Sequence, residues 1–487
     1  LDLINDQFIR TTILYCSCVM ERKLIVFILL LYSSHGQLVD KLFPNLSSSA
    51  RQITNTLANQ SVFNTLTKTA GDVLVETVYS ITSVPVALAR AVGSVEIPNI
   101  INGRNNMDFD RILGEYNSGL GNEDATLSID QLIVKYGYPV EKHKVITSDG
   151  YVLTLFRIPG NGSVVFLMHG LLGSADDYVI AGPETSISYL LANDGYDVWL
   201  GNARGNKHSR RHVSLQPSEA LFWDFSWHEI GVYDLPAMID YTLKVTKKTS
   251  LQYIGHSQGT TSFFVMASQR PEYNKKIKLM IALAPVSFVS HLKSPVVRLV
   301  APGTSFIHII LKSLGLYELL PDSPVFRVLK TLMCGVGPLS EAFCSNALLL
   351  TVGFGFSELN ITNLPVIYGH EPSGAAIKQI AHYGQGFLSG EFRQYDYGSH
   401  LNLRRYGSVT PPNYPLEKIS APVALFYSND DWISHPVDVK KLYNRLGNCI
   451  DLYRVPHNQF NHLDFIWAKN FKSLIYKRAK KLLETYT

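Results

Sequence analysis

The sequence predicts an α/β fold with a mostly parallel sheet and helices on both of its faces. Short apolar runs alternate with helical patterns, the runs lying at 164–168, 196–200, 251–254 and 277–283 and the helices at 234–245 and 260–269. Parallel strands covered on both faces are continuously apolar, and each needs a crossover connection to the next. The strand pattern returns at 423–427 and 450–455, before a predicted final helix at 464–483.

The composition supports an enzyme-sized globular protein and excludes several other classes. Of the 487 residues 46% are hydrophobic and 17% are charged, which excludes a disordered or collagen-like chain. A formal charge of +4 over this length is too weak for a nucleic-acid-binding protein. Five cysteines without a Cys-x-x-Cys pair do not form a disulfide scaffold, and we expect no structural metal and no cofactor.

The beginning of the chain predicts where the protein is targeted rather than part of its fold. Residues 1–19 precede Met20 and are interpreted as a non-native or upstream extension outside the fold. Residues 20–36 place Arg22 and Lys23 before a short apolar run and a small polar stretch, which is the order of a secretory signal peptide. A buried helix is the alternative. The run is too short to span a bilayer, so we expect a mature protein without a transmembrane anchor, either secreted or delivered to the lysosome.

Other features are compatible with the secretory route. Cys334 and Cys344 close a short loop and could pair in an oxidising lumen. Such a route would also permit N-glycosylation of Asn-x-Ser/Thr sequons, which occur at Asn45, Asn59, Asn161 and Asn360.

Changes in composition and in hydrophobic pattern predict the domain boundaries. Residues 37–125 are rich in Asn, Ser and Thr and are interpreted as a poorly ordered leader. The strand and helix alternation of 126–285 predicts the first part of an α/β core, which 418–487 completes. Between them, 286–417 carries helical stretches and loops with few strand runs, and we expect it to form a cap inserted into the core.

A Gly-x-Ser-x-Gly pentapeptide, 255–259, points to a nucleophile. The pattern alone is weak and could be an ordinary glycine-rich turn. Here it follows a strand-like run and precedes a predicted helix, which is the context of a nucleophile elbow. The glycines allow a strained serine where strand and helix cross closely. Ser257 is therefore predicted to be the nucleophile.

A serine needs a base to remove its proton, and proteins with this elbow carry the histidine last in the chain. His462 follows the predicted strand 450–455 and precedes the last helix, so it lies in a loop at the sheet edge. His457 and His435 are nearby alternatives. We predict that His462 is the base.

Two adjacent acids follow the strand 423–427. Asp431 is preferred because Trp432 and the next residue look buried, whereas Asp430 could serve as a turn residue. Asp438 stands at a predicted helix start and is less favoured. Asp431 is predicted to orient the histidine, with Asp430 as the alternative.

The oxyanion of a tetrahedral intermediate needs backbone N–H donors. Gln258, directly after Ser257, supplies the first by position. The predicted strand 164–168 runs into the loop His169-Gly170-Leu171-Leu172-Gly173, where the N–H of Leu171 could supply the second. His169 precedes the nucleophile and is expected to shape this loop.

With these residues in place, the chain resembles the animal acid lipase family, which includes gastric lipase and lysosomal acid lipase. The resemblance runs from about Leu127 to the C-terminus and rests on ordered blocks: Tyr136-Gly137-Tyr138-Pro139, Thr147-Ser148-Asp149-Gly150-Tyr151, His169-Gly170-Leu171-Leu172, Gly195-Tyr196-Asp197-Val198-Trp199-Leu200-Gly201-Asn202, Gly255-His256-Ser257-Gln258-Gly259-Thr260, Cys344-Ser345-Asn346-Ala347 and Asn461-His462-Leu463-Asp464-Phe465.

The resemblance implies an α/β-hydrolase fold with an inserted helical cap and a mobile lid. It implies a disulfide between Cys334 and Cys344. It further implies a role for each site residue: Ser257 as nucleophile, Asp431 as acid, His462 as base, and Leu171 and Gln258 as oxyanion donors.

The expected activity is hydrolysis of neutral lipid esters, such as triacylglycerols or cholesteryl esters, through an acyl-enzyme. The substrate would lie at an oil–water or membrane interface. A carboxylesterase or thioesterase acting on smaller esters is the first alternative, because a fold does not fix its substrate. A catalytically silent lipid-binding protein is the second, but such a protein would be expected to have lost one of the three catalytic side chains.

Overall fold

The computed structural model describes residues 121–294, 297–298, 308, 311–312, 315–320 and 357–487, all within one compact unit, Ala87–Thr487. The predicted signal peptide 20–36 lies outside the described residues. So do the predicted leader, except for its last few residues, and four predicted site residues: Asn45, Asn59, Cys334 and Cys344.

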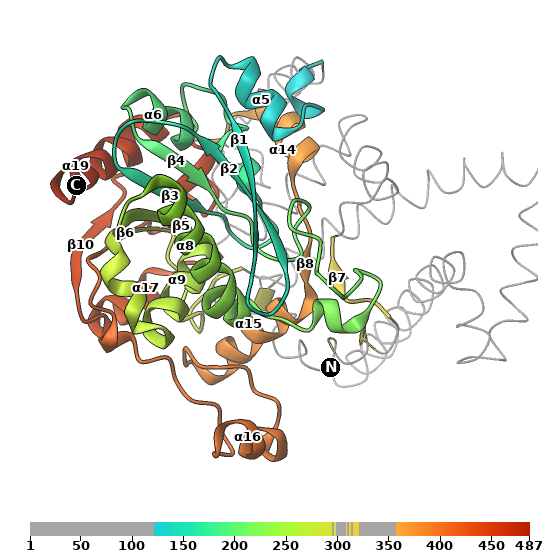
Figure 1. The fold of residues 1–487 in the computed structure, drawn as a ribbon. Coiled ribbons are helices and arrows are strands. Elements are labelled where there is room, and N and C mark those ends of the chain that lie inside the picture. Colours follow the sequence, from blue (N-terminus) through green and yellow to red (C-terminus); the bar gives the residue numbers. More distant parts are fainter. Residues whose placement is uncertain (1–120, 295–296, 299–307, 309–310, 313–314, 321–356) are drawn as a thin grey trace, which may run out of the picture. The chain divides into compact units, whose positions relative to one another are not determined.

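An eight-stranded sheet forms the centre of the described unit (Figure 1). Its strands are β1 (Glu141–Ile146), β2 (Val152–Ile158), β3 (Val164–Met168), β4 (Asp197–Leu200), β5 (Leu251–His256), β6 (Ile277–Leu283), β9 (Val423–Tyr427) and β10 (Cys449–Arg454). The spatial order is β1-β2-β4-β3-β5-β6-β9-β10. β2 pairs antiparallel with β1 and β4, and every pair from β4 to β10 is parallel. The predicted mostly parallel sheet is confirmed.

Helices cover both faces of this sheet. The long ones are α5 (Ile129–Lys135), α6 (Ile187–Asn193), α8 (Leu235–Thr246), α9 (Gln258–Gln269), α17 (Pro436–Arg445) and α19 (Lys477–Thr485). Along β3 the side chains of Val165 and Leu167 enter a core shared with α5, α6 and α19. Phe166 and Met168 point the other way, into a core shared with α8, α9 and α17. Because both faces are covered, β3 is apolar throughout, as the sequence pattern predicted.

Short helical segments complete the core. They are η1 (Glu123–Ala125), η2 (Ala175–Tyr178), η3 (Ala220–Trp223), α7 (Trp227–Glu229), η4 (Ile230–Asp234), η5 (Pro271–Lys276), α18 (Asp464–Trp467) and η9 (Lys472–Tyr476). Among the described residues, no helix is long and apolar enough to cross a membrane.

A long insertion separates β6 from β9, which are neighbours in the sheet. Its described elements are β7 (Glu318–Leu319), η7 (Ile361–Asn363), α14 (Leu364–His370), β8 (Ala375–Ala376), α15 (Ile377–Ser389), α16 (Ser399–Tyr406) and η8 (Leu416–Lys418). β7 and β8 form a small antiparallel pair. The cap expected at 286–417 falls partly on residues outside the described ranges.

The predicted single helix at 464–483 is wrong. α18 ends at Trp467, because Ala468 takes an extended conformation with ψ 137°. Ala468 forms a β-bridge with Leu359, and the N–H of Lys469 donates to the Glu358 carbonyl at 2.8 Å. Pairing with a segment of the insertion therefore replaces the helical hydrogen bonds at this point, and the helix resumes in η9 and α19.

One buried cation stabilises the loop that follows β4. Arg204 is 2% exposed, and its Nε donates to Asp234 Oδ1 at 2.7 Å while Nη1 donates to Asp149 Oδ2 at 2.6 Å. Its guanidinium lies 4.0 Å from the centre of the Tyr151 ring. The positive charge is thus matched on two sides by carboxylates and on a third by an aromatic face.

Replacing Arg204 with Met should lower the free energy of unfolding by about 3–5 kcal/mol, because Asp234 would then bury its charge without a partner or have to take up a proton. Urea unfolding followed by circular dichroism measures this change. Arg404→Met, at an exposed position of α16, is the matched control and should change stability by less than about 0.5 kcal/mol. Equal stability of the two variants would contradict the prediction.

Candidate active site

The pentapeptide 255–259 forms a sharp turn between β5 and α9. Ser257 has φ 51° and ψ −117°, a backbone conformation that residues with a side chain rarely adopt. A Cβ added at Gly255 would lie 2.9 Å from the carbonyl carbon of Gly259, and one added at Gly259 would lie 2.1 Å from the Met168 carbonyl oxygen. Both glycines are therefore required by the close crossing of β3, β5 and α9.

The structure brings together the three side chains expected from the sequence. Ser257 Oγ lies 2.7 Å from His462 Nε2, and His462 Nδ1 lies 2.8 Å from Asp431 Oδ2. Ser257 is 9% exposed, His462 5% and Asp431 0%, so water screens these contacts weakly. Each residue follows a strand that ends at the same edge of the sheet: β5, β10 and β9, respectively.

Asp431 is the acid that reaches the histidine. Its Oδ1 accepts hydrogen bonds from the N–H groups of Ile433 and Ser434, both at 2.8 Å, while Oδ2 faces His462. Both carboxylate oxygens are therefore bound, which fixes the direction of the side chain. Burial raises the pKa of the neighbouring Asp430 to about 6.

The alternative histidines are used elsewhere. His435 caps the start of α17, where its Nδ1 accepts from the Val437 N–H at 3.4 Å. His457 Nε2 lies 3.4 Å from Glu358 Oε1. Both therefore have local partners of their own.

The residues 169–173, called here the β3 loop, pass beside Ser257. A Cβ added at Gly170 would lie 3.2 Å from Ser257 Cβ, so the loop approaches the serine as closely as packing allows. Leu171 comes next in the chain, and Leu172 has a φ of 64°. Gln258 begins α9, and the first N–H groups of a helix have no partner within it. Both segments therefore lie directly beside Ser257.

His169 shapes the β3 loop. Its Nδ1 lies 2.7 Å from the Gly170 carbonyl oxygen, and its Nε2 accepts from the Ala203 N–H at 3.1 Å. It is buried, and burial lowers its pKa to about 4, which keeps the ring neutral. The ring connects the β3 loop to the loop after β4 that Arg204 stabilises.

Three further residues support the site, and no sequence motif pointed to their roles. His256 Nε2 donates to the carbonyl oxygen of His462 at 2.9 Å, which ties the turn to the histidine loop. From the insertion, Gln379 on α15 accepts from Gln258 Nε2 at 2.6 Å. Tyr383 on the same helix hydrogen-bonds with Thr261 at 2.9 Å.

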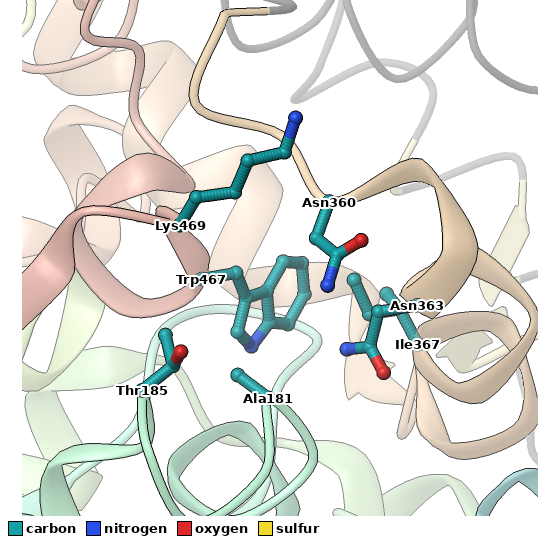
Figure 2. Close-up of a pocket in the computed structure, with 7 residues that line it drawn as sticks. All are labelled: Ala181, Thr185, Asn360, Asn363, Ile367, Trp467 and Lys469. Atoms are coloured by element: carbon teal, nitrogen blue, oxygen red, sulfur yellow. The ribbon is translucent and has the colours of Figure 1, made fainter. Parts of the chain in front are cut away.

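A small surface pocket lies apart from these residues (Figure 2). Its volume is about 10 Å³, the space that one water molecule needs. The indole ring of Trp467 forms one wall, and the side chains of Asn360 and Asn363 lie opposite. None of the three hydrogen-bonded side chains lines it, so it is not a site for an ester with a long chain.

The chemistry open to this arrangement is nucleophilic. An imidazole held by a buried carboxylate can take the proton of a serine hydroxyl, which makes the oxygen a nucleophile. N–H groups beside the serine can stabilise a negative oxygen formed by its attack.

Fold and site together define an ester hydrolase of the α/β-hydrolase class. The chain is 44% identical to Lipase 1 of Drosophila melanogaster, over 74% of this chain and 80% of that one. It belongs to the animal acid lipase family. It is also 42% identical to Lipase 3 of the same fly, over 72% of this chain and 91% of that one, and 38% identical to bovine gastric triacylglycerol lipase, over 74% and 92%.

Two family descriptions match segments of the chain. Residues 129–182 match the partial alpha/beta-hydrolase lipase region, and residues 163–304 match the alpha/beta hydrolase fold. Both segments include the β3 loop, and the second includes Ser257.

Replacing Gly259 with Ala should lower the free energy of unfolding by about 1–3 kcal/mol, because the new methyl group meets the backbone of Met168. Thermal unfolding measures this effect. Gly386→Ala, in α15, is the matched control: its nearest neighbour is 3.4 Å away, and alanine is favoured over glycine within a helix. A Gly259→Ala variant as stable as the control would contradict the steric argument.

Proposed function

We propose that this protein is a serine lipase that hydrolyses neutral lipid esters, such as triacylglycerols or cholesteryl esters. The observation that carries the proposal is the buried hydrogen-bonded chain from Ser257 through His462 to Asp431. The names of its relatives, among them gastric triacylglycerol lipase, support this substrate class.

The first half of the reaction forms an acyl-enzyme. Ser257 Oγ attacks the ester carbonyl carbon while His462 Nε2 takes its proton, and Asp431 stabilises the imidazolium that results. The N–H groups of Leu171 and Gln258 donate to the oxygen that becomes negative. Collapse of this intermediate releases the alcohol, which takes the proton from His462.

The second half releases the fatty acid. Water gives a proton to His462 and attacks the acyl carbon, passing through a second tetrahedral intermediate at the same N–H donors. The proton then returns to Ser257 Oγ, and the fatty acid leaves. These steps use water and the chain's own groups.

The insertion between β6 and β9 serves in this proposal as a cap with a lid over the acyl chains. A lid that opens at a lipid surface would expose apolar area that is costly to leave in water, which links opening to the interface. The contacts of α15 with α9 support a location of the insertion beside the serine.

We also propose that the protein follows the secretory pathway, to the outside or to the lysosome. Asn161 and Asn360 are both exposed, as glycosylated asparagines must be. The pairing of Cys334 with Cys344 remains a prediction of the sequence.

Replacing Ser257 with Ala should reduce hydrolysis of a triolein emulsion by about 10⁴-fold or more, because the nucleophile is lost. Fatty acid release measured by titration at constant pH tests this expectation, with thermal unfolding to show that the variant is folded. A folded variant with undiminished activity would reject the mechanism.

A parallel assay with tributyrin and a soluble p-nitrophenyl butyrate separates lipase activity from that of a carboxylesterase or thioesterase. A lipase should prefer the emulsion. Turnover of the soluble ester alone would show that the proposed lipid substrates are wrong, while the proposed mechanism would stand.

Asp431→Asn should lower kcat by about 10⁴-fold, because an amide favours the wrong tautomer of His462. Asp430→Asn is the matched control, at the adjacent acid, and should change kcat by less than about threefold, since its carboxyl group is not bound to the histidine. Steady-state kinetics on p-nitrophenyl butyrate measures both, and the reverse ranking would assign the acid to Asp430.

A further inference from the structure

Two buried carboxyl groups lie directly beneath the β3 loop. Asp177, in η2, is 3% exposed, and Glu371, which follows α14, is 7% exposed. Their carboxyl groups lie within hydrogen-bonding reach of each other. A Cβ added at Gly173, the last residue of the loop, would lie 2.2 Å from Asp177 Oδ2. The carboxyl group of Asp177 therefore occupies the space that a side chain at position 173 would need.

Glu371 is linked to the end of the loop through the hydroxyl groups of two serines. Its Oε1 accepts from the hydroxyl of Ser174, the residue after Gly173, at 2.7 Å. Its Oε2 accepts from the hydroxyl of Ser373 at 2.6 Å, and the N–H of Ser373 donates to the Leu172 carbonyl at 2.7 Å. A displacement of Glu371 would therefore be transmitted to Leu172, directly after Leu171, and to Ser174.

The basic side chains of this region contact a third acid. Asp176 lies 2.6 Å from Lys207 Nζ, 2.6 Å from His208 Nε2 and 2.7 Å from His370 Nδ1. Burial alone would raise the pKa of Asp176, but Lys207 and the two histidines hold it well below its usual range. Asp176 is therefore a carboxylate, and its negative charge acts on its neighbour Asp177.

The pKa values of Asp177 and Glu371 are both raised. Burial raises the pKa of Asp177 well above its usual range, and the negative charges of Glu371 and Asp176 raise it further. Burial also raises the pKa of Glu371, although Lys207 opposes this effect. Two adjacent buried carboxyl groups cannot both ionise without strong repulsion, so one holds a proton and donates it to the other.

We infer that Asp177 and Glu371 form a proton-sharing pair that positions the β3 loop, so that the N–H of Leu171 is held in place only while the pair keeps its proton. This inference rests on the proposed function, because it assigns Leu171 as an oxyanion donor. Asp177 and Glu371 are positioning residues, since they act through the loop and not on the reacting atoms.

The sign of the pH dependence follows from the direction of the shift. An aspartate in an unfolded chain loses its proton near pH ~4. A group whose pKa is raised in the folded protein contributes stability fully below that value and loses it as pH rises through the folded pKa. The loop should thus be well positioned at acid pH and lose its position as pH rises. His462 must be unprotonated to act as base, so the triad accounts for the fall of kcat at low pH. Loss of the proton from the pair accounts for the fall of kcat at high pH.

The test compares the pH profiles of kcat and KM for wild type, Asp177→Asn and Glu371→Gln on p-nitrophenyl butyrate. Either amide keeps a hydrogen bond to the remaining carboxylate and removes the second ionisable group. Both variants should move the alkaline fall of kcat upward by at least about one pH unit, with KM within about twofold of wild type. Asp177→Ala, which keeps no hydrogen bond, should lower kcat by about tenfold or more at every pH, because an oxyanion donor is misplaced.

Asp430→Asn is the matched control, since it removes another carboxyl group whose pKa burial raises but which lies outside the pair. Its alkaline fall should coincide with that of wild type. Alkaline limbs of Asp177→Asn and Glu371→Gln that also coincide with wild type would overturn the inference, whether or not Asp177→Ala folds.

Ser257→Ala separates the two proposals. If the Ser257→Ala variant keeps the full activity of wild type, the proposed function is wrong. Activity lost in Ser257→Ala, together with unshifted limbs in both amide variants, would defeat only the role of the pair.

Discussion

The close crossing of α9 with β3 and β5 is the constraint on which the site depends. With no room for a side chain at Gly255 or Gly259, the helix begins directly against the carboxyl end of β3. That approach forces Ser257 into its strained conformation and places Gly170 against it. One steric condition therefore sets the nucleophile, the start of the helix and the neighbouring loop together, before any hydrogen bond to the histidine is considered.

Around this crossing the fold accommodates buried acids in three different ways. Asp431 is bound by two backbone N–H groups and an imidazole, so both of its carboxyl oxygens have partners. Asp234 faces the guanidinium of Arg204. For Asp177, burial and the negative charges of Glu371 and Asp176 raise the pKa, so that it shares a proton with Glu371, while Lys207 contacts Asp176. Each solution avoids an unpaired buried charge by different chemistry.

The sequence predicted the parts of the molecule that local patterns determine. The central strands are continuously apolar because both faces are covered, and the triad residues follow strand ends in a known order. β1 was not predicted, since its residues alternate between half-buried and exposed and include charged side chains. The break at Ala468 was not predicted either, because it depends on a bridge to Leu359 from a remote segment. Local propensity cannot anticipate such a tertiary contact.

The same limit explains why the residues that support the site could not be predicted from the sequence. Some of them come from the insertion, which therefore does more than cover the core. Glu371 and Gln379 come from the segment between β6 and β9, and each meets a core residue adjacent to the catalytic machinery. Their partners, Ser174 and Gln258, lie in the part of the core that precedes the insertion. Removing the insertion would leave buried polar groups of the core without hydrogen bonds, at a cost that neither part meets alone. The core and the insertion must therefore fold together for the loop and the turn to take the positions that the chemistry requires.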